Sequence, residues 1–181
     1  MLVRSARPHE TDALAQIGLA AWQKGIAPLV SANVAAAIEQ TNPFLPFVRE
    51  LGSRILVAET DGEPAGLGAC EHGDDVISDI WVDPAFEGRG AGSALMKALE
   101  SQIAHRGYRQ ARIQVAAQNA RALQLYQHLG YQVRWRKVAF DPILRIDLEK
   151  VGLSKALLHP QVSGSKRRQK ASRPSSGLAI P

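Results

Sequence analysis

Hydrophobic residues recur along the first 150 residues with two periods, which predict alternating strands and helices. Strands are expected where apolar and polar residues alternate or where short apolar runs lie between turn residues, at 2–6, 54–60, 64–71, 76–82, 110–115, 133–139 and 144–148. Helices are expected where apolar residues recur every three or four positions, at 14–21, 34–38, 95–103 and 122–129. The resulting order predicts a single α/β domain with a mixed sheet, in which an antiparallel meander precedes the helical crossovers.

Turn and capping residues mark the ends of these elements. Asp61-Gly62 lies between two strand patterns and predicts an antiparallel hairpin. Ser31 and Asn119 stand where a side-chain oxygen would cap the start of a helix, and Gly130 is placed to end the last helix. Three proline dipeptides are expected to stop elements: Asn42-Pro43 a helix, Asp83-Pro84 a strand, and Asp141-Pro142 the first of the last two strands.

The net charge of +5 comes from the C-terminal segment. Residues 151–181 contain six lysines and arginines and no acidic residue, so the rest of the chain is close to neutral. The segment is rich in Ser, Pro and Gly and has no apolar periodicity after residue 158, which predicts disorder. We therefore expect a domain at 1–150 and a basic tail at 151–181. A nucleic acid is not expected as a partner of the domain, and only the tail would suit one.

Composition excludes several other classes of protein and site. No apolar run approaches the roughly 20 residues that cross a bilayer, and residues 1–7 show no signal-peptide core, so we expect a cytoplasmic protein with no membrane partner. The single cysteine, Cys70, cannot form an internal disulfide or a thiolate cluster, and no metal site is expected.

The strongest chemical signal lies at residues 77–95. A strand pattern there leads into the turn Gly88-Arg89-Gly90-Ala91-Gly92 and then into a helical pattern. Glycines let the backbone approach a ligand, and the first turn of a helix offers free N–H groups, which together suit a phosphate or pyrophosphate. Arg89 would add a charge-assisted contact. A P-loop is excluded because its Gly-Lys-Ser/Thr run is missing, and a dinucleotide fingerprint because its third glycine is missing. A glycine turn that only packs helix against strand remains an alternative.

Two segments of the chain resemble the GCN5-related N-acetyltransferase (GNAT) family. Val82-Asp83-Pro84 followed by residues 87–92, Glu-Gly-Arg-Gly-Ala-Gly, is similar to the family's Val-x-Pro and Gln/Arg-x-x-Gly-x-Gly/Ala acetyl-CoA signature. Residues 119–131 are similar to its second signature, Asn-x-x-Ala-x-x-Leu-Tyr-x-x-x-Gly-Phe/Tyr. The resemblance covers residues 2–150. It implies an α/β fold with a mixed, largely antiparallel β-sheet flanked by helices, with splayed central strands, in a single domain.

The resemblance implies an acetyl-CoA-dependent N-acetyltransferase. Acetyl would pass to a primary amine of a small molecule or protein by direct attack in a ternary complex, between strands 76–82 and 110–115. A homodimer is compatible with this resemblance. Several residues would hold acetyl-CoA: backbone groups of Ile80, Trp81 and Val82 along the pantetheine, Arg89, Gly90, Ala91, Gly92 and Ser93 around the pyrophosphate, and Asn119 at the pantetheine. The Val82 N–H would also polarise the thioester carbonyl.

One residue departs from the first signature. Glu87 stands where the family has Gln or Arg. Because a carboxylate repels a pyrophosphate, we expect the Glu87 side chain to point away, leaving the binding to backbone N–H groups.

The resemblance assigns the catalytic acid to Tyr126, which would protonate the departing CoA thiolate. A tyrosine that only fills the apolar helix face is the alternative. The base is expected among four carboxylates near the acceptor side, Glu71, Asp74, Asp75 and Asp79. Asp79 is the first choice, but its orientation depends on whether the strand contains a bulge. His72 is a weaker candidate, and Cys70 is interpreted as a small buried hydrophobe.

The acceptor cleft is expected beneath the N-terminal helices. Trp22, Phe44 and Phe47 lie in these helices and the loop that follows, which would roof the cleft, although Trp22 is also a typical core residue. An alternative function is a non-catalytic CoA-binding module that docks on nucleic acid or the ribosome through the basic tail. In that case, replacing Tyr126 by phenylalanine would change no measurable property.

Overall fold

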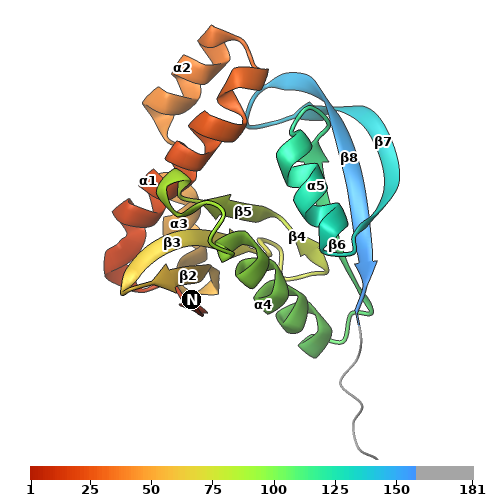
Figure 1. Cartoon of the computed structure of the whole chain (residues 1–181). Coiled ribbons are helices and arrows are strands. Elements are labelled where there is room, and N and C mark those ends of the chain that lie inside the picture. Colours follow the sequence, from red (N-terminus) through yellow and green to blue (C-terminus); the bar gives the residue numbers. More distant parts are fainter. Residues whose placement is uncertain (158–181) are drawn as a thin grey trace, which may run out of the picture.

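The strands form two four-stranded sheets (Figure 1). The computed structural model describes residues 1–157. The first sheet is antiparallel, in the order β1-β2-β3-β5, with β1 at Leu2–Ser5, β2 at Leu56–Thr60, β3 at Glu63–Ala69 and β5 at Asp79–Val82. The second has the order β4-β6-β8-β7, with β4 at Val76–Ile77, β6 at Gln110–Ala116, β8 at Ile146–Ala156 and β7 at Gln132–Asp141. Only the pairing of β4 with β6 is parallel.

The strand expected at 76–82 changes sheet at Ser78. Its first two residues pair with β6 as β4, and its last four pair with β3 as β5. Ser78 holds the crossing point, because its N–H and its hydroxyl both donate to the Ala69 carbonyl, at 3.0 and 3.2 Å. Beyond this point β5 and β6 diverge, and β5 is an edge strand of the first sheet among the described residues. The predicted splayed central strands are thus confirmed.

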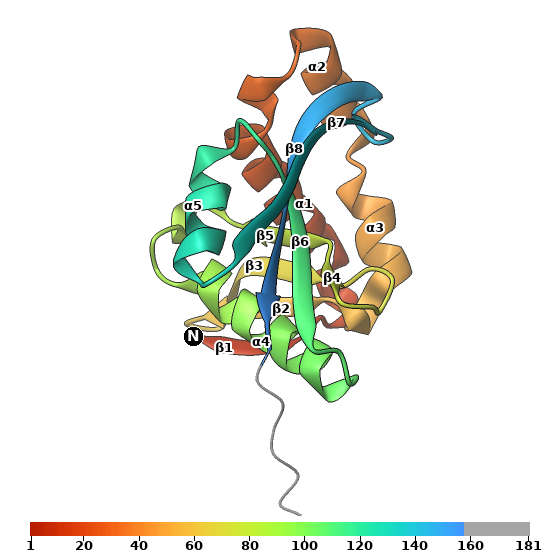
Figure 2. The same ribbon diagram turned by 90° about the vertical axis from the view of Figure 1, so that its right-hand side faces the viewer.

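Helices cover both faces of the first sheet because its strands alternate their apolar side chains. Leu56 and Ala58 pack with α4 (Ala91–His105), whose apolar stripe is fully buried. Val57 and Leu67 face the other way, toward α1 (Thr11–Gly25) and α3 (Phe44–Leu51). In the view of Figure 2, α5 (Ala120–His128) lies on one side of β6 and β8, and α3 on the other. Within residues 1–157, no helix is both long and apolar enough to cross a membrane.

Most predicted caps and turns are present. The Ser31 hydroxyl accepts the Val34 N–H at 3.4 Å at the start of α2 (Ala32–Thr41), and Asn119 Oδ1 accepts the Ala122 N–H at 3.1 Å at the start of α5. Asp61-Gly62 joins β2 to β3 with positive φ at both residues, 54° and 86°, as a tight hairpin requires.

Helix α3 is missing from the sequence prediction. Asn42 ends α2 in a left-handed conformation as expected, but Pro43 then stands at the N-cap of a further helix. Pro46 lies in the first turn of that helix, where backbone N–H groups have no intrahelical acceptor and proline is tolerated. Eight residues are too short to show a clear helical period, which is why we expected a loop.

Strand β8 extends well beyond its predicted end at residue 148. Residues 151–156 pair with β6, and Val151 and Leu153 are buried in the core. The boundary expected at residue 150 therefore falls inside β8 and is corrected to its end at Ala156. Lys155, counted with the tail above, binds Glu100 of α4 at 2.8 Å. The remainder of the expected tail, 158–181, lies outside the described residues.

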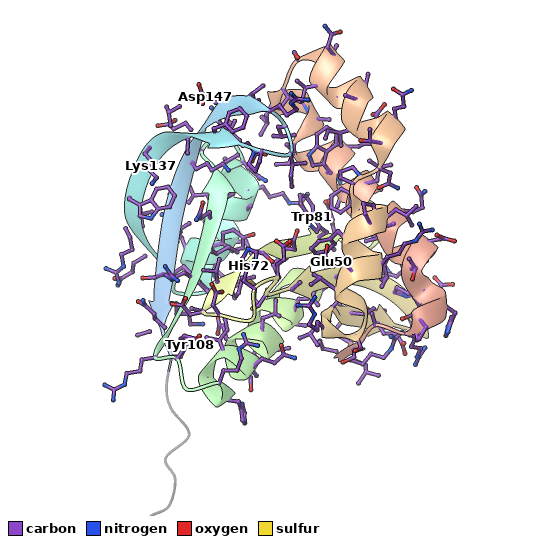
Figure 3. The ribbon with its side chains drawn as sticks, turned by 180° about the vertical axis from the view of Figure 1, so that it is seen from behind. Glu50, His72, Trp81, Tyr108, Lys137 and Asp147 are labelled. Carbon is purple, nitrogen blue, oxygen red and sulfur yellow. The ribbon has the colours of Figure 1, made fainter. Side chains whose placement is uncertain are left out.

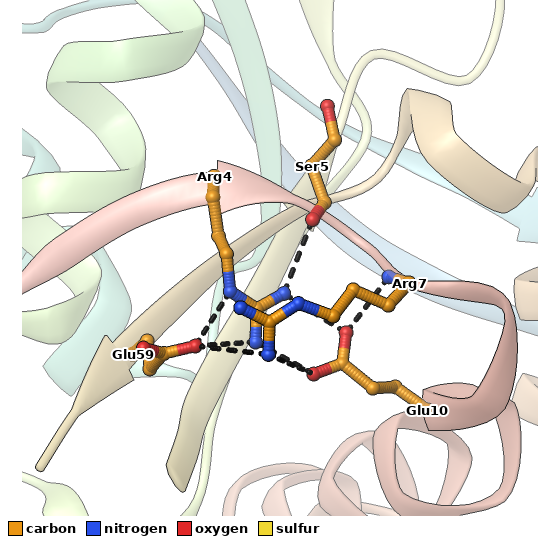
Figure 4. Close-up of polar contacts among 5 residues, drawn as sticks. All are labelled: Arg4, Ser5, Arg7, Glu10 and Glu59. Carbon is orange, nitrogen blue, oxygen red and sulfur yellow. Dashed lines mark hydrogen bonds and ion pairs between the residues drawn. The ribbon is translucent and has the colours of Figure 1, made fainter. Parts of the chain in front are cut away.

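A partly buried ion network fixes the start of α1 on the first sheet (Figure 4). Arg4 on β1 donates to both carboxylate oxygens of Glu10, at 2.9 and 2.6 Å, and to Glu59 on β2 at 2.6 Å. The Arg7 N–H also donates to Glu10, at 2.8 Å. The hydrogen bonds from Arg4 hold the pKa of Glu10 below its usual value. The network joins β1, β2 and the chain entering α1, and so helps to position that helix.

Candidate active site

A cavity of about 660 Å³ lies where the two sheets diverge. One side is formed by β4, β5 and β6 and by α5, and the other by α1, α2, α3 and the turn between β7 and β8. Figure 3 shows Trp81 of β5 in the middle of the molecule, between the N-terminal helices and the second sheet. Asp79 and Tyr126, predicted as base and acid, both line this cavity.

Asp79 faces the cavity because β5 begins at Asp79, after the chain has changed sheet. Asp79 and Trp81 are two residues apart on β5 and therefore share one face. The indole Nε1–H of Trp81 donates to Asp79 Oδ1 at 2.9 Å, which orients the carboxylate. Burial raises the pKa of Asp79 above its ordinary value, and this makes the carboxylate a stronger base.

The other candidates for the base lie differently. Asp75 binds an arginine of β6, and Asp74 accepts the N–H of the first residue of β4, so both are used in the fold. Glu71 and His72 line the cavity, with exposed side chains. Cys70 is absent from the lining and buried, and burial raises the pKa of its thiol, in agreement with its interpretation as a small hydrophobe. No group of three metal-ligating side chains occurs within residues 1–157.

Tyr126 combines a packing position with access to the cavity. It is 7% exposed and belongs to the same buried cluster as the α4 stripe, so the core role weighed above is present. Burial, and to a lesser extent the negative charge of Asp79, raise the pKa of Tyr126 well above its ordinary value. The phenol therefore stays protonated at every ordinary pH and remains available as a proton donor.

The glycine turn opens the N-terminus of α4. Gly88 and Gly90 have φ of 75° and 89°, a region in which a side chain is strained, and Gly90 is the N-cap residue. The N–H groups of the first turn of α4, at Ala91, Gly92 and Ser93, have no carbonyl acceptor within the helix. Arg89 is exposed and lies over the ring of Phe86, 5.3 Å from its centroid. The turn thus has the backbone geometry of an anion site.

Glu87, the departure from the signature, is held by two cations. Its carboxylate accepts from Lys24 Nζ of α1 and Arg121 Nη1 of α5, both at 2.6 Å. Burial alone would raise the pKa of Glu87, but these hydrogen bonds outweigh it and hold the pKa below its usual value. The negative charge is therefore compensated locally, and the side chain connects two helices on either side of the glycine turn.

The remaining predicted cofactor residues lie along one path. Ile80, Trp81 and Val82 belong to β5, whose outer edge pairs with no other strand of the described chain. Asn119 lines the same cavity as Ile80 and Trp81, and its side chain also caps α5. Both roles considered for Asn119 are therefore compatible with one position.

Sequence reasoning missed part of the cavity wall. Trp22, Phe44 and Phe47 line it as expected, and Trp22 is also a buried core residue. Further lining residues come from segments that carry no chemical motif: Ile26 and Ile38 of the helical region, and Asp141, Leu144, Leu148 and Lys150 around the β7–β8 turn. Asp141-Pro142 was interpreted only as a turn, and it does form one, since Asp141 Oδ1 accepts the Leu144 N–H at 3.0 Å.

Comparisons with known proteins agree with this geometry. Residues 20–131, more than half of the chain, match the Acetyltransferase (GNAT) family. An uncharacterised N-acetyltransferase of Methanocaldococcus jannaschii is 34% identical over 87 residues, which are 43% of this chain and 38% of that protein. The chain thus spans less than half of the length of this curated relative.

Two solved structures share the fold. A GCN5-related N-acetyltransferase of Rhodopseudomonas palustris superposes with a TM-score of 0.70 at 23% identity, covering 86% of this chain and 95% of its own. The PaiA N-acetyltransferase of Thermoplasma acidophilum, solved in complex with coenzyme A, has a TM-score of 0.65 at 16% identity, covering 86% and 98%. With the family match over residues 20–131, the chain belongs to the GNAT acetyltransferase family.

Proposed function

We propose that the protein is an acetyl-CoA-dependent N-acetyltransferase that transfers acetyl to a primary amine in a ternary complex. One observation carries the proposal: the free edge of β5 leads from Asp79, in the cavity, to the glycine turn at the start of α4. A ligand with an extended amide arm and a pyrophosphate fits this path. The same chemistry is supported by the fold shared with the Thermoplasma acidophilum N-acetyltransferase solved with coenzyme A.

Backbone groups are proposed to provide most of the cofactor binding. The pantetheine arm would lie along Ile80, Trp81 and Val82 as an added strand, with Asn119 beside it. The pyrophosphate would bind the N–H groups from Arg89 to Ser93, where the α4 dipole favours negative charge. The thioester carbonyl would then lie near the Val82 N–H, which stabilises the oxygen as it becomes negative.

The chemical step needs one base and one acid. The amine loses its proton to Asp79, directly or through water, and its nitrogen forms a bond to the thioester carbonyl carbon. The tetrahedral intermediate then collapses, the C–S bond breaks, and the leaving thiolate takes the proton of Tyr126. Asp79 is suited to the first transfer by its raised pKa, and Tyr126 to the last because it stays protonated.

A binding and turnover experiment tests the proposal. Calorimetry should detect acetyl-CoA binding, and a panel of primary amines should include at least one that releases CoA thiol at a KM for acetyl-CoA between about 1 µM and 1 mM, the range usual for enzymes. No acetyl-CoA binding, or binding with no turnover on any amine, would contradict it.

Two buried tyrosines, Tyr126 and Tyr131, offer a matched test of the acid. Tyr126→Phe should lower kcat by about 10²–10⁴-fold at an unchanged KM for acetyl-CoA. Tyr131→Phe is the control, since Tyr131 is also buried but does not line the cavity, and its hydroxyl has no hydrogen-bond partner among the described residues. Equal kcat values in the two variants would exclude Tyr126 as the acid and leave it only its packing role.

We further propose a cytoplasmic homodimer with the basic segment outside the catalytic domain. The support for a dimer is the edge strand β7, on which Val138 and Phe140 expose large apolar side chains. The docking role considered for the basic segment concerns residues 158–181, outside the described part of the chain, and is not needed for acetyl transfer.

A further inference from the structure

The acceptor half of the cavity is walled mainly by packed apolar side chains and carries the partly buried carboxylate of Asp79, and this combination restricts the amine. We infer that the acceptor is a small primary amine with an apolar, preferentially aromatic, body and with neither a carboxylate nor a second cationic group. The inference rests on the proposed function, because it names the substrate class of that same site.

Enclosure argues for a small molecule. Leu144 and Leu148 of the β7–β8 region belong to one buried cluster with Trp22, Ile38 and Phe44 of the helices, and each of the five is at most 9% exposed. Figures 1 and 2 show the β7–β8 turn reaching the N-terminal helices. A peptide or folded protein would need an open groove between these elements, whereas their packing closes it. A cavity of about 660 Å³ instead has the size of an ordinary small-ligand site.

Aromatic rings line the cavity next to the predicted base. Gly18 allows Phe44 to pack directly on α1, since a Cβ at Gly18 would lie 2.4 Å from the Phe44 ring. Phe44 meets the Trp81 ring edge to face, with centroids 5.1 Å apart at 82°. Trp81 in turn donates to Asp79. An amine held at Asp79 therefore places the rest of its body against aromatic and aliphatic side chains.

The charges of the cavity select an amine with no acid group. Lys150 is the one lysine or arginine among the lining residues of the described chain, and Asp141 holds it at 2.9 Å. A carboxylate on the acceptor would find no free cation there and would lie near Asp79. A second ammonium group would lose its hydration against the apolar wall, or would pair with Glu71, whose side chain is 44% exposed, so that water screens the attraction; a diamine is therefore disfavoured as well.

A matched set of amines tests the inference with the full chain and acetyl-CoA. We expect kcat/KM for 2-phenylethylamine to exceed that for ethylamine by about 10–100-fold, the gain of burying a phenyl group. Phenylalanine adds only a carboxylate to 2-phenylethylamine and should be at least about tenfold poorer. Diaminobutane and a peptide with an N-terminal phenylalanine and one lysine should also be poorer.

The outcomes separate this inference from the proposed function. Turnover of phenylalanine, the diamine or the peptide at or above the rate for 2-phenylethylamine overturns the substrate class and leaves the N-acetyltransferase intact. If acetyl-CoA binds but no amine is acetylated, the proposed function fails. Calorimetry on the CoA-loaded protein then measures the affinity for each amine and tests the inferred substrate class directly. Tighter binding of 2-phenylethylamine than of diaminobutane then supports it, and equal or weaker binding overturns it.

A pair of variants tests the wall itself. Ile26 lines the cavity and is half-buried at the end of α1, so Ile26→Ser should raise the KM for 2-phenylethylamine about three- to tenfold and leave that for ethylamine unchanged. Leu2→Ser removes a side chain of the same size from the exposed surface of β1, outside the cavity, and should change neither KM. Equal KM values in Ile26→Ser and Leu2→Ser would contradict an apolar acceptor wall.

Discussion

The two ends of the proposed site are built in different ways. The proposed acetyl-CoA end consists mainly of residues 79–93, a continuous piece of chain that runs from β5, at the cavity, through the glycine turn to α4. The proposed acceptor end joins residues 22–47 to residues 141–150, which are distant in sequence and meet only in the folded protein. The first end offers mainly backbone groups, whose positions follow from strand pairing and φ. The second offers side chains held by packing.

This difference determines how each end responds to substitution. Side-chain changes at the acetyl-CoA end should matter little unless they alter φ at a glycine or the charge around the turn. At the acceptor end, single side chains set both the chemistry and the fit of the amine. Variants that act on one substrate alone therefore test whether the two ends are as separate as the structure indicates.

Among the variants that distinguish the two ends, the largest expected effect is that of Asp79→Asn. Asparagine keeps an oxygen for the Trp81 N–H but cannot accept the amine proton, so kcat/KM for the amine should fall by about 10²-fold or more near neutral pH. The KM for acetyl-CoA should stay within about twofold of the wild-type value, since backbone groups are proposed to provide most of that binding. A parallel loss of acetyl-CoA binding would show that the two ends are not separate. Glu71→Gln removes the other carboxylate that lines this part of the cavity and serves as the control.

The pH dependence of Asp79→Asn has a definite sign. The base must be ionised, so wild-type activity should fall as the pH drops through the raised pKa of Asp79, and the variant should lack this part of the profile. Because its pKa is raised in the folded state, the Asp79 carboxyl makes a contribution to the stability of the fold that is fully present below its unfolded pKa of about 3.9. This contribution is lost as the pH rises through the pKa of Asp79 in the folded state. Urea unfolding should therefore show a gain in stability of Asp79→Asn over wild type that appears on raising the pH.

The same difference explains what the sequence could predict. The hairpin at Asp61-Gly62, the caps at Ser31 and Asn119 and the glycine turn each depend on neighbouring residues, and all were predicted correctly. The orientation of Asp79 could not be predicted, because it depends on Ser78 switching the chain between two sheets. The acceptor wall depends on contacts between opposite ends of the chain, and such contacts leave no local pattern.

A smaller, tenfold effect is expected for Gly90→Ala. A side chain at φ of 89° costs about 1–2 kcal/mol of stability and disturbs the N–H groups that would face the pyrophosphate. The KM for acetyl-CoA should rise about tenfold while that for the amine stays unchanged. Gly107→Ala is a matched control, because Gly107 has φ of 92°, follows the other end of α4 and also has open space around its Cβ position. Both variants should lose similar stability, and an equal rise in KM would assign the effect to stability alone.

The smallest expected effect is that of Glu87→Gln. The Glu87 carboxylate, beside the glycine turn, is bound by one cation from α1 and one from α5. The substitution leaves Lys24 and Arg121 without their shared carboxylate beside the turn, so the local field becomes more favourable to an anion. The KM for acetyl-CoA should fall about two- to fivefold at low salt, and the difference should shrink as salt screens it. Because both cations are half or more exposed, the unfolding free energy should change by no more than about 1 kcal/mol.

A rise in the KM for acetyl-CoA in Glu87→Gln would mean that Glu87 acts chiefly by holding α1 and α5 in place, and Lys24→Met would then raise this KM equally. A fall in KM for Glu87→Gln together with a rise for Lys24→Met would instead identify the charge around the turn, and not the link between helices, as what Glu87 controls.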